Sequence, residues 1–188
     1  MNSSHEDEKE VLLRCRRGEK QAFEIIVKKY MKRAYFIALG LVGQHEDALD
    51  LSQEAFIRAY RNIKKFNPEQ QFFPWFYQIL KNLCFNHLKK IRNHRLASLQ
   101  QITETELAAQ RNDDFDPNLL VERNEIKDRV WKAIGQLGEK HREIIILRHF
   151  QNLSYGEIAE ALFCSKGTVM SRLYYARKAL KEILDHET

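Results

Sequence analysis

Cationic, hydroxyl and aromatic side chains alternate with apolar ones near the C-terminus, between residues 153 and 180. Two short helical patterns cover this stretch, and the break between them falls at the tetrapeptide Cys164-Ser165-Lys166-Gly167. Apolar residues recur where two such helices must pack closely: Ile158, Ala159, Leu162, Val169 and Leu173. The pattern predicts a helix-turn-helix, whose second helix enters the major groove of DNA. An ordinary amphipathic helical hairpin would show the same periodicity, so spacing alone leaves both interpretations open.

The second helix of this motif would direct a set of polar, cationic and aromatic residues outward. They are Lys166, Thr168, Met170, Ser171, Arg172, Tyr174, Tyr175 and Arg177. Lysine and arginine hold phosphates, whereas hydroxyl and apolar groups contact the edges of bases. These side chains are therefore the candidate DNA contacts of the C-terminal part.

The stretch LSYGEIAEALFCSKGTVMSRLYYARKAL resembles the promoter-reading module of extracytoplasmic-function (ECF) sigma factors, through its leucine-serine-tyrosine opening and its Gly-Thr-Val-x-Ser-Arg core. The segment before it, LGEKHREIIILRHFQN, resembles the start of sigma domain 4. The resemblance implies contacts at the −35 promoter element by Arg148, to a phosphate, and by Ser171, Arg172, Tyr174 and Arg177. Met170 and Tyr175 stand where basic residues are frequent, which implies fewer guanine contacts and more apolar or shape-based readout. Phe163 stands where a helix-ending glycine is common.

Composition favours a folded, helical chain. Of its 188 residues, 44% are hydrophobic and 30% are charged, a balance that allows a core and excludes a wholly disordered protein. Only seven glycines and three prolines interrupt it, and its length suits one ordinary domain or two small ones. The formal net charge is +5, which suits a polyanionic partner. Positive charge predominates in residues 1–95 and 126–188, whereas residues 96–125 are acidic.

The cysteines and the N-terminus exclude other classes of protein. Cys15, Cys84 and Cys164 form an odd, scattered set without a CxxC pair, so neither a disulfide framework nor a cysteine-based zinc site is expected. The polar N-terminus lacks the basic-then-apolar order of a secretory signal, and no apolar run reaches the length of a membrane span. We therefore expect a cytoplasmic protein with no cofactor, no metal and no membrane insertion.

Helical patterns follow one another through the first part of the chain. Residues 1–8 read as a frayed tail, and a helix from Val11 is expected to end near Gly18. A longer helix follows, with one apolar face formed by Phe23, Ile26, Val27, Tyr30, Ala34, Ile37, Ala38 and Leu41. Gly40 and Gly43 bracket its predicted end.

Residues 44–66 predict another helix, acidic at its start and basic at its end, as the helix dipole prefers. A solvated face would account for its polar residues. The phrase DALDLSQEAFIRAYRNIKKF, however, is similar to the part of sigma domain 2 that binds the coiled coil of the β′ clamp subunit of RNA polymerase. That resemblance implies polymerase contacts by Asp50, Gln53, Glu54 and Arg58.

The densest aromatic cluster follows, at residues 66–85. Phe72, Phe76 and Phe85 are expected to be core residues. A second helical face carries Trp75, Gln78, Asn82, Asn86 and Lys89, and it continues into a basic end with Lys90 and Arg92. Cations that hold phosphates, beside amides and an aromatic ring that can contact unpaired bases, are what recognition of single-stranded DNA requires.

The segment FNPEQQFFPWFYQILKNLCFNHLKK resembles the promoter-melting segment of ECF factors, in which a loop and the following helix capture flipped −10 bases. The resemblance implies −10 contacts by Phe66, Asn67, Trp75, Asn82, Asn86, Lys89, Lys90 and Arg92. Pro74 replaces a small or polar residue and Gln78 replaces a common arginine, so contacts with the strand differ in detail here. Pocket contacts must offset the few kcal/mol that base extraction costs.

Together these features predict an all-α protein of two small helical domains, residues 10–95 and 119–184, joined by a flexible acidic linker at residues 96–118. The resemblance implies a sigma factor that binds core RNA polymerase, through the β′ clamp and β, and promoter DNA, with an anti-sigma factor as a further partner. A dimeric helix-turn-helix regulator is the alternative. An enzyme with Cys84, His87 and His94 as metal ligands is less favoured, because no carboxylate or second cysteine completes that site.

Overall fold

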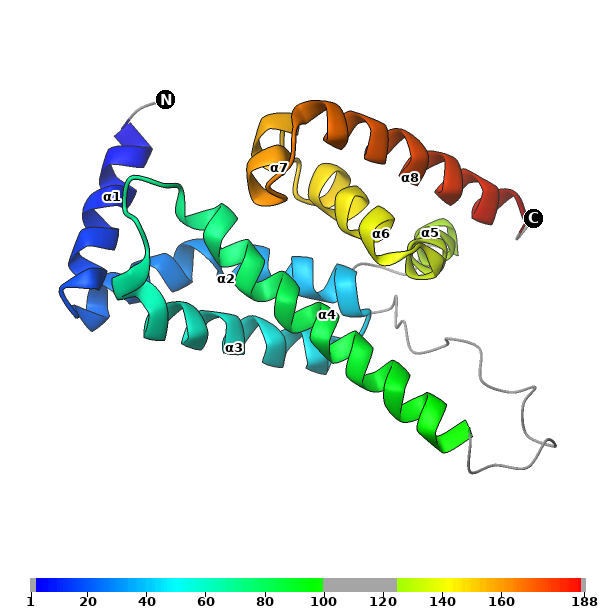
Figure 1. The fold of residues 1–188 in the computed structure, drawn as a ribbon, viewed down its shortest axis with the longest axis horizontal. Coiled ribbons are helices and arrows are strands. Elements are labelled where there is room, and N and C mark those ends of the chain that lie inside the picture. Colours follow the sequence, from blue (N-terminus) through cyan, green and yellow to red (C-terminus); the bar gives the residue numbers. More distant parts are fainter. Residues whose placement is uncertain (1–2, 100–124, 187–188) are drawn as a thin grey trace.

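The computed structural model describes the backbone of residues 3–99 and 125–186 and the side chains of residues 8–94 and 129–186. Every regular element in these ranges is a helix, which confirms the all-α prediction (Figure 1). The helices form two halves, one before and one after residues 100–124. Most of the predicted linker and the predicted start of the second domain at residue 119 lie outside the described residues, so these boundaries stay predictions.

The first half is built from four α-helices and one short 3-10 turn. They are α1 (Ser3–Arg16), α2 (Lys20–Val42), α3 (His45–Asn62), η1 (Ile63–Lys65) and α4 (Phe72–Leu99). Gly18 and Gly43 follow α1 and α2 in the left-handed region, with φ of 94° and 84°. Glycine adopts this conformation without the penalty that a Cβ imposes, and so both helix ends fall where the sequence predicted them.

The prediction of a frayed tail is wrong for residues 3–8, because α1 already begins at Ser3. Glu8, in its second turn, is buried and accepts a hydrogen bond of 2.8 Å from the hydroxyl of Tyr30. It also forms an ion pair with Lys29 of α2. A buried carboxylate is tolerated only when it is paired, and these partners anchor the start of α1 to α2.

Aromatic side chains fill the core of the first half, as expected for Phe72 and Phe76, which are at most 1% exposed. Phe76 stacks on Phe56 of α3 with ring centroids 4.5 Å apart and on Phe72 with centroids 5.5 Å apart. Phe85 is only partly buried, at the edge of this core. The predicted apolar face of α2 is also buried, with Val27 partly so.

The second half contains α5 (Glu125–Gln136), α6 (Glu139–Ile145), α7 (Tyr155–Ala161) and α8 (Lys166–His186), and α6 runs on into a π-helical turn, η4 (Ile146–Phe150). The run Ile144-Ile145-Ile146-Leu147 is at most 2% exposed, which confirms that it is covered on more than one side. Neighbouring residues of this run point in different directions, so α6 must lie between other helices.

Helices α7 and α8 form the predicted helix-turn-helix. A capping box starts α7: the side chain of Ser154 accepts a hydrogen bond from the backbone of Glu157, and the carboxylate of Glu157 accepts one from the backbone of Ser154. These hydrogen bonds lower the pKa of Glu157. Ile158 of the first helix and Val169 and Leu173 of the second are at most 1% exposed and belong to the core, as predicted. Phe163 lies in the turn with a φ of 49°, which is unusual for a residue with a side chain.

The two halves pack against each other through a junction formed by Gly40, Leu41, Tyr77, Lys81, Arg142 and Glu143. The hydroxyl of Tyr77 donates a hydrogen bond of 2.7 Å to the carboxylate of Glu143, which is 2% exposed. Lys81 lies 2.9 Å from the same carboxylate oxygen. Burial and the neighbouring carboxylate raise the pKa of Tyr77, which therefore stays protonated and can donate.

Arg142 completes the junction from the other side. Its guanidinium donates to the carbonyl of Leu41 at 2.9 Å, in the last turn of α2, and to the carbonyls of Leu137 and Gly135 at the end of α5. A cation is favourable at helix C-termini, where carbonyl groups lack helical partners. The halves also approach closely at Gly40, because a Cβ there would lie 2.9 Å from Cδ1 of Ile146.

Candidate nucleic-acid and protein interfaces

Helix α3 presents the four residues predicted to contact polymerase on one side of the first half. Asp50, Gln53 and Arg58 are exposed, and Glu54 is partly exposed. Arg58 donates from Nε to Oε1 of Glu54 at 2.7 Å, so two of the four residues pair with each other. An exposed pair of this kind contributes little stability, and a partner can exchange it at low cost.

Sequence reasoning missed two apolar residues on this helix. Leu49 and Ile57 are 42% and 45% exposed, and they lie among the four polar residues. With steps of 100° per residue, Leu49, Gln53 and Ile57 fall within 80° of one another. Exposed leucine and isoleucine beside charges are typical of a protein-binding face. In the sequence, Leu49 and Ile57 fall outside the spacing of the buried residues Ala48, Ala55 and Ala59. This position off the buried face could have identified them as exposed apolar residues.

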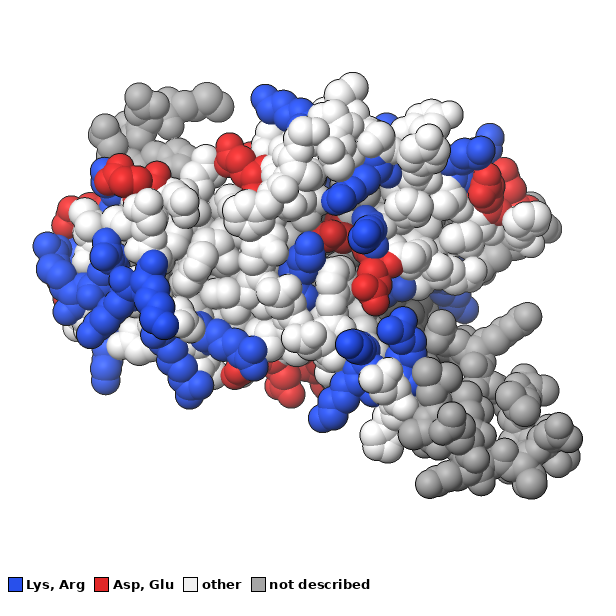
Figure 2. All heavy atoms as spheres, viewed as in Figure 1, with Lys and Arg blue, Asp and Glu red and all other residues white. Residues whose placement is uncertain are grey.

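Helix α4 has three distinct sides. One side belongs to the aromatic core and another, with Tyr77 and Lys81, belongs to the junction. The third side exposes Asn82, Asn86, Lys89, Lys90 and Arg92. Figure 2 shows lysine and arginine side chains gathered over the later part of this helix. The structure therefore brings five of the predicted −10 residues together on an open surface.

The remaining predicted −10 residues lie differently. Phe66 is 2% exposed, and its ring packs 4.9 Å from that of Trp75. Trp75 is itself only partly buried. Asn67 is exposed, and its side-chain oxygen accepts from the backbone of Glu69 at 3.1 Å, which fixes the turn before α4. Phe66 and Trp75 thus pack together beneath the loop of residues 66–71, and Asn67 fixes the conformation of this loop.

Gln78, which the sequence placed on the same face as Asn82, is engaged elsewhere. Its side-chain amide donates a hydrogen bond to the backbone carbonyl of Ala161 in α7. This contact extends the junction between the halves. Gln78 is therefore not available to DNA in this arrangement.

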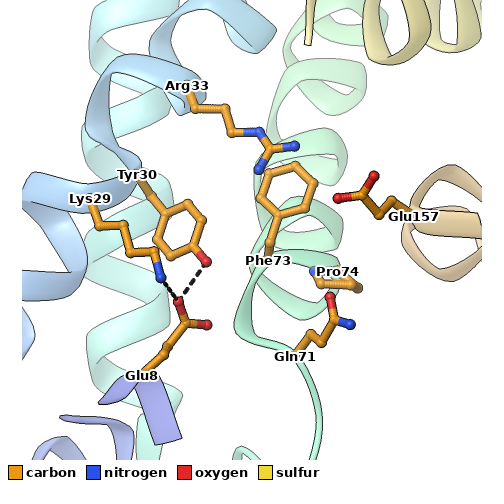
Figure 3. Close-up of a pocket in the computed structure, with 8 residues that line it drawn as sticks. All are labelled: Glu8, Lys29, Tyr30, Arg33, Gln71, Phe73, Pro74 and Glu157. Atoms are coloured by element: carbon orange, nitrogen blue, oxygen red, sulfur yellow. Dashed lines mark hydrogen bonds and ion pairs between the residues drawn. The ribbon is translucent and has the colours of Figure 1, made fainter. Parts of the chain in front are cut away.

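A polar pocket of about 140 Å³ lies beside the loop, lined by Glu8, Lys29, Tyr30, Arg33, Gln71, Phe73, Pro74 and Glu157 (Figure 3). The guanidinium of Arg33 lies 3.8 Å from the ring centre of Phe73. Burial lowers the pKa of Arg33. The lining residues come from α1, α2, the segment at the start of α4 and α7, so the pocket lies where the two halves meet.

The second helix of the helix-turn-helix, α8, exposes most of the predicted −35 residues. Met170, Tyr174 and Tyr175 are 57%, 66% and 58% exposed, and Lys166, Ser171 and Arg177 are exposed as well. Thr168 and Arg172 are partly buried. Phe163, in the preceding turn, is 75% exposed, and the sequence had singled it out only for replacing a glycine.

Arg148 lies apart from α8, at the end of the preceding helix. Its guanidinium donates to the carbonyl of Leu153 at 2.8 Å and lies 5.2 Å from the ring centre of Tyr155. These contacts hold the segment that leads into α7. One terminal nitrogen of Arg148 is thus committed within the chain.

No group of three or more potential metal ligands occurs among the described residues. Burial raises the pKa of Cys15 to about 11 and that of Cys84 to about 12, so both are neutral thiols at pH 7. Nε2 of His87, one of the three residues of the disfavoured metal site, lies 2.9 Å from the carboxylate of Asp47 in α3. Among the described helices, none is long and apolar enough to cross a membrane.

Two sigma-70 family models match the chain. Sigma-70 region 2 matches residues 26–94, and a sigma-70 region 4 model matches residues 127–180. Among curated proteins, the chain is 32% identical to the RNA polymerase sigma-H factor of Pseudomonas aeruginosa, covering 96% of this chain and 95% of that one. It is 31% identical to the ECF sigma factor SigW of Bacillus subtilis, with 94% and 96% covered, and 32% identical to the ECF sigma-E factor of Escherichia coli, with 89% and 88% covered.

Solved structures agree on the fold. CnrH, in complex with the cytosolic domain of CnrY, superposes with a TM-score of 0.71 at 22% identity, covering 96% of this chain and 99% of that one. RpoE of Bartonella quintana, in complex with the anti-sigma factor NepR, gives 0.67 at 24% identity, with 87% and 96% covered. The chain belongs to the sigma-70 family, in its extracytoplasmic-function group, and is an alternative sigma factor that directs transcription by RNA polymerase.

Proposed function

We propose that three separate faces divide the work of promoter recognition. The α3 face, with Asp50, Gln53, Glu54 and Arg58, binds the coiled coil of the β′ clamp. The open side of α4 receives the −10 strand, and α8 reads the −35 element in the duplex. The observation that carries this proposal is that all three faces are exposed on helices whose other sides are buried. Each can therefore meet a partner without unfolding.

The α3 face has the composition of a protein interface. Leu49 and Ile57 supply apolar area, and the surrounding charges supply orientation. Arg58 and Glu54 pair with each other near the surface of the helix. A partner can therefore form new ion pairs with either residue without leaving a buried charge unpaired.

The open side of α4 has the composition of a surface for unpaired bases. Amides such as Asn82 and Asn86 can both donate to and accept from the edge that a base exposes when its pairing is lost. Lys89, Lys90 and Arg92 follow on the same helix and are positioned to hold the backbone phosphates. Phe66 contributes indirectly, because it supports Trp75 and the loop from below.

The reaction itself belongs to the polymerase. This chain supplies binding energy that favours the open promoter and acts in the cytoplasm as a regulatory subunit with no catalytic group of its own. Binding the melted −10 strand more tightly than the duplex shifts the equilibrium toward the open state.

An anti-sigma factor is a further expected partner. CnrH and RpoE were each solved with a protein partner bound, and RpoE's partner is an anti-sigma factor. For this chain, we propose that such a protein covers the α3 face from Asp50 to Arg58. It would then compete directly with polymerase.

Reconstitution tests the proposed function. The purified chain is mixed with bacterial core polymerase and scored for co-elution, and then for initiation on a pool of genomic promoter fragments. We expect a stable complex that initiates at a subset of promoters. Ile57→Asp should weaken this complex, whereas Ile25→Asp, which changes a similarly exposed isoleucine on α2 (46% against 45%), should not.

Failure to associate, with DNA binding by the chain alone, would contradict the proposal. A stable dimer and a palindromic target would then favour the dimeric helix-turn-helix regulator.

A further inference from the structure

The outer face of α8 combines a helix built for the major groove with apolar side chains where base contacts are made. We infer that this chain selects its −35 element through the methyl groups of thymines, contacted by Met170 and Tyr174, and not through hydrogen bonds to guanine. The inference rests on the proposed function and names the base that the same surface reads.

The residues of α8 separate cleanly by direction. The buried residues Val169, Leu173 and Ala176 define the inner side. With steps of 100° per residue, Met170, Ser171 and Tyr174 lie within about 100° of one another on the opposite side. These three residues occupy the first half of the helix, the part that contacts base edges in this motif.

Met170, Ser171 and Tyr174 form a row along the helix, and the cations lie at the edges of this row. On the same angular scale, Lys166 and Arg177 fall beyond Met170 on one edge, and Arg172 falls beyond the other edge, toward the core. Lys178 points outward one turn after Tyr174, about 6 Å farther along the helix axis and about 12 Å from Met170, so it lies past the C-terminal end of the row. The cations are therefore placed to hold phosphates on either side of the groove, and no arginine or lysine occupies the centre of the row.

The hydroxyl groups near the centre are already engaged. Ser171 donates from Oγ to the carbonyl of Thr168 at 3.1 Å. Thr168 and Ser165 exchange a hydrogen bond of 2.9 Å between their hydroxyls, and Oγ of Ser165 also accepts from the backbone of Thr168 at 3.0 Å. These bonds stabilise the turn and the first turn of α8. They leave Met170, Tyr174 and Tyr175 as the large exposed side chains of α8, and of these Met170 and Tyr174 belong to this row.

Exposed apolar side chains that lie next to one another are typical of an interaction surface. Met170 is 57% exposed and Tyr174 is 66% exposed. Figure 2 shows the upper surface over the start of α8 as largely uncharged, with lysine and arginine around it. An apolar centre with a cationic margin complements a DNA groove, whose floor carries methyl groups and whose walls carry phosphates. An apolar protein segment would not need the flanking cations.

Thymine is the base that fits. The major-groove edge of thymine carries a C5-methyl group, whereas guanine presents two acceptors that arginine or lysine bind in pairs. Without such a cation at the centre of the row, guanine gains no paired hydrogen bond of this kind from this surface. Methionine is flexible and polarisable, so it can adapt to a methyl group in the groove.

Deoxyuridine substitution isolates the methyl group, because uracil differs from thymine only there. The reconstituted polymerase complex first selects its promoters from a fragment pool. Thymines in the shared −35 element are then replaced by deoxyuridine one at a time, and binding is measured at fixed salt. Each contacted thymine should lose about fourfold in affinity on losing its methyl group.

Met170→Ala completes a double-mutant cycle. At the thymine that Met170 contacts, the variant should bind the thymine promoter about as weakly as the normal chain binds the deoxyuridine promoter, and it should no longer discriminate between the two there. Met31→Ala is the matched control, because Met31 is similarly exposed, at 54%, on α2. It should retain the full discrimination. Met170→Arg should shift the selected element toward guanine at the contacted position.

The outcomes separate this inference from the proposed function. If the complex initiates but its selected −35 elements lack thymine, or deoxyuridine has no effect, the inference is wrong and the sigma role stands. If Met170→Ala retains full discrimination, Met170 does not contact the methyl. If no complex with polymerase forms, the proposed function fails first. If Met170→Ala changes only the binding of a protein partner, α8 carries a protein-docking face instead.

Discussion

Helices α4 and α8 both present an exposed face to DNA in the proposed function, yet the two faces are built from opposite chemistry. The face of α4 carries two amides and three cations, whereas the face of α8 carries methionine and tyrosines with cations only at its margins. The difference matches the state of the DNA that each would meet. Unpaired bases expose edges that require hydrogen bonds, whereas paired bases in the groove also offer methyl groups.

In the proposed function, the chain divides two tasks between its halves: stabilising the open promoter and selecting the site. The proposed hydrogen bonds from Asn82 and Asn86 to bases would form fully only after the duplex has opened, so they would favour melting. The inferred apolar contacts from Met170 would form in the closed duplex, so they would favour the choice of site. Amino-acid changes in the junction, in α4 and in α8 test this division.

Glu143→Ala tests whether both faces depend on the junction between the halves. It removes the buried partner of Tyr77 and Lys81 and should lower the free energy of unfolding by about 3 kcal/mol. Thermal unfolding followed by circular dichroism measures this loss. Glu160→Ala, an exposed change on α7, is the control and should be close to neutral. An unchanged melting temperature for Glu143→Ala would mean that the junction adds no stability.

Asn82→Ala should weaken the α4 face alone. We expect a loss of about tenfold or more in open-complex formation, because a base edge loses its hydrogen-bonding partner. Permanganate reactivity of unpaired thymines measures opening, and co-elution checks that polymerase binding persists. A promoter with a pre-melted −10 region should show the same ranking of variants, since the contact is to the unpaired base. Normal opening by a folded variant would remove Asn82 from the site.

Arg172→Ala should weaken the α8 face without changing which bases it prefers. We expect about a fivefold loss at physiological salt, with a decrease of about one in the slope of log affinity against log salt. Binding titrations at several salt concentrations measure both values. Arg172→Lys retains the charge and should keep most of the slope. A change in the preferred −35 sequence would show instead that Arg172 reads a base.

Phe163→Gly should have the smallest effect and should leave both faces unchanged. Its φ of 49° is costly for phenylalanine and free for glycine, although glycine also gains freedom in the unfolded chain. We expect a net gain of about 0.5 kcal/mol in the free energy of unfolding, measured by denaturant titration. Phe163→Ala retains the backbone penalty and should give no gain. A loss on Phe163→Gly would show that the ring itself makes a stabilising contact.

Local patterns predicted the helices well, because helical periodicity and glycine positions are visible in the sequence. The ends of α1 and α2 at Gly18 and Gly43, the buried run at Ile144–Leu147 and the packing of the helix-turn-helix followed from them. The open side of α4 followed too, since amides and cations at helical spacing cannot all enter an apolar core.

The junction could not be predicted in the same way. Its central residues, Tyr77, Lys81, Arg142 and Glu143, are polar or amphipathic and read as surface when each helix is considered alone. For the same reason Gln78 was grouped with the DNA face, although it binds the carbonyl of Ala161. Phe66 was also assigned to the DNA-binding face, because an aromatic ring in a loop can stack on a base as well as fill a core. Only the tertiary arrangement distinguishes these possibilities.

The junction also has a consequence for how the protein is made. Tyr77 and Glu143 are separated by 66 residues, which a ribosome adds in about 3 to 13 seconds at its usual speed. During that interval the first half can fold, but the surface around Gly40 and Tyr77 has nothing to cover it. Each newly synthesised molecule therefore passes through a stage in which a chaperone, or another nascent chain, can reach a surface that the finished protein conceals.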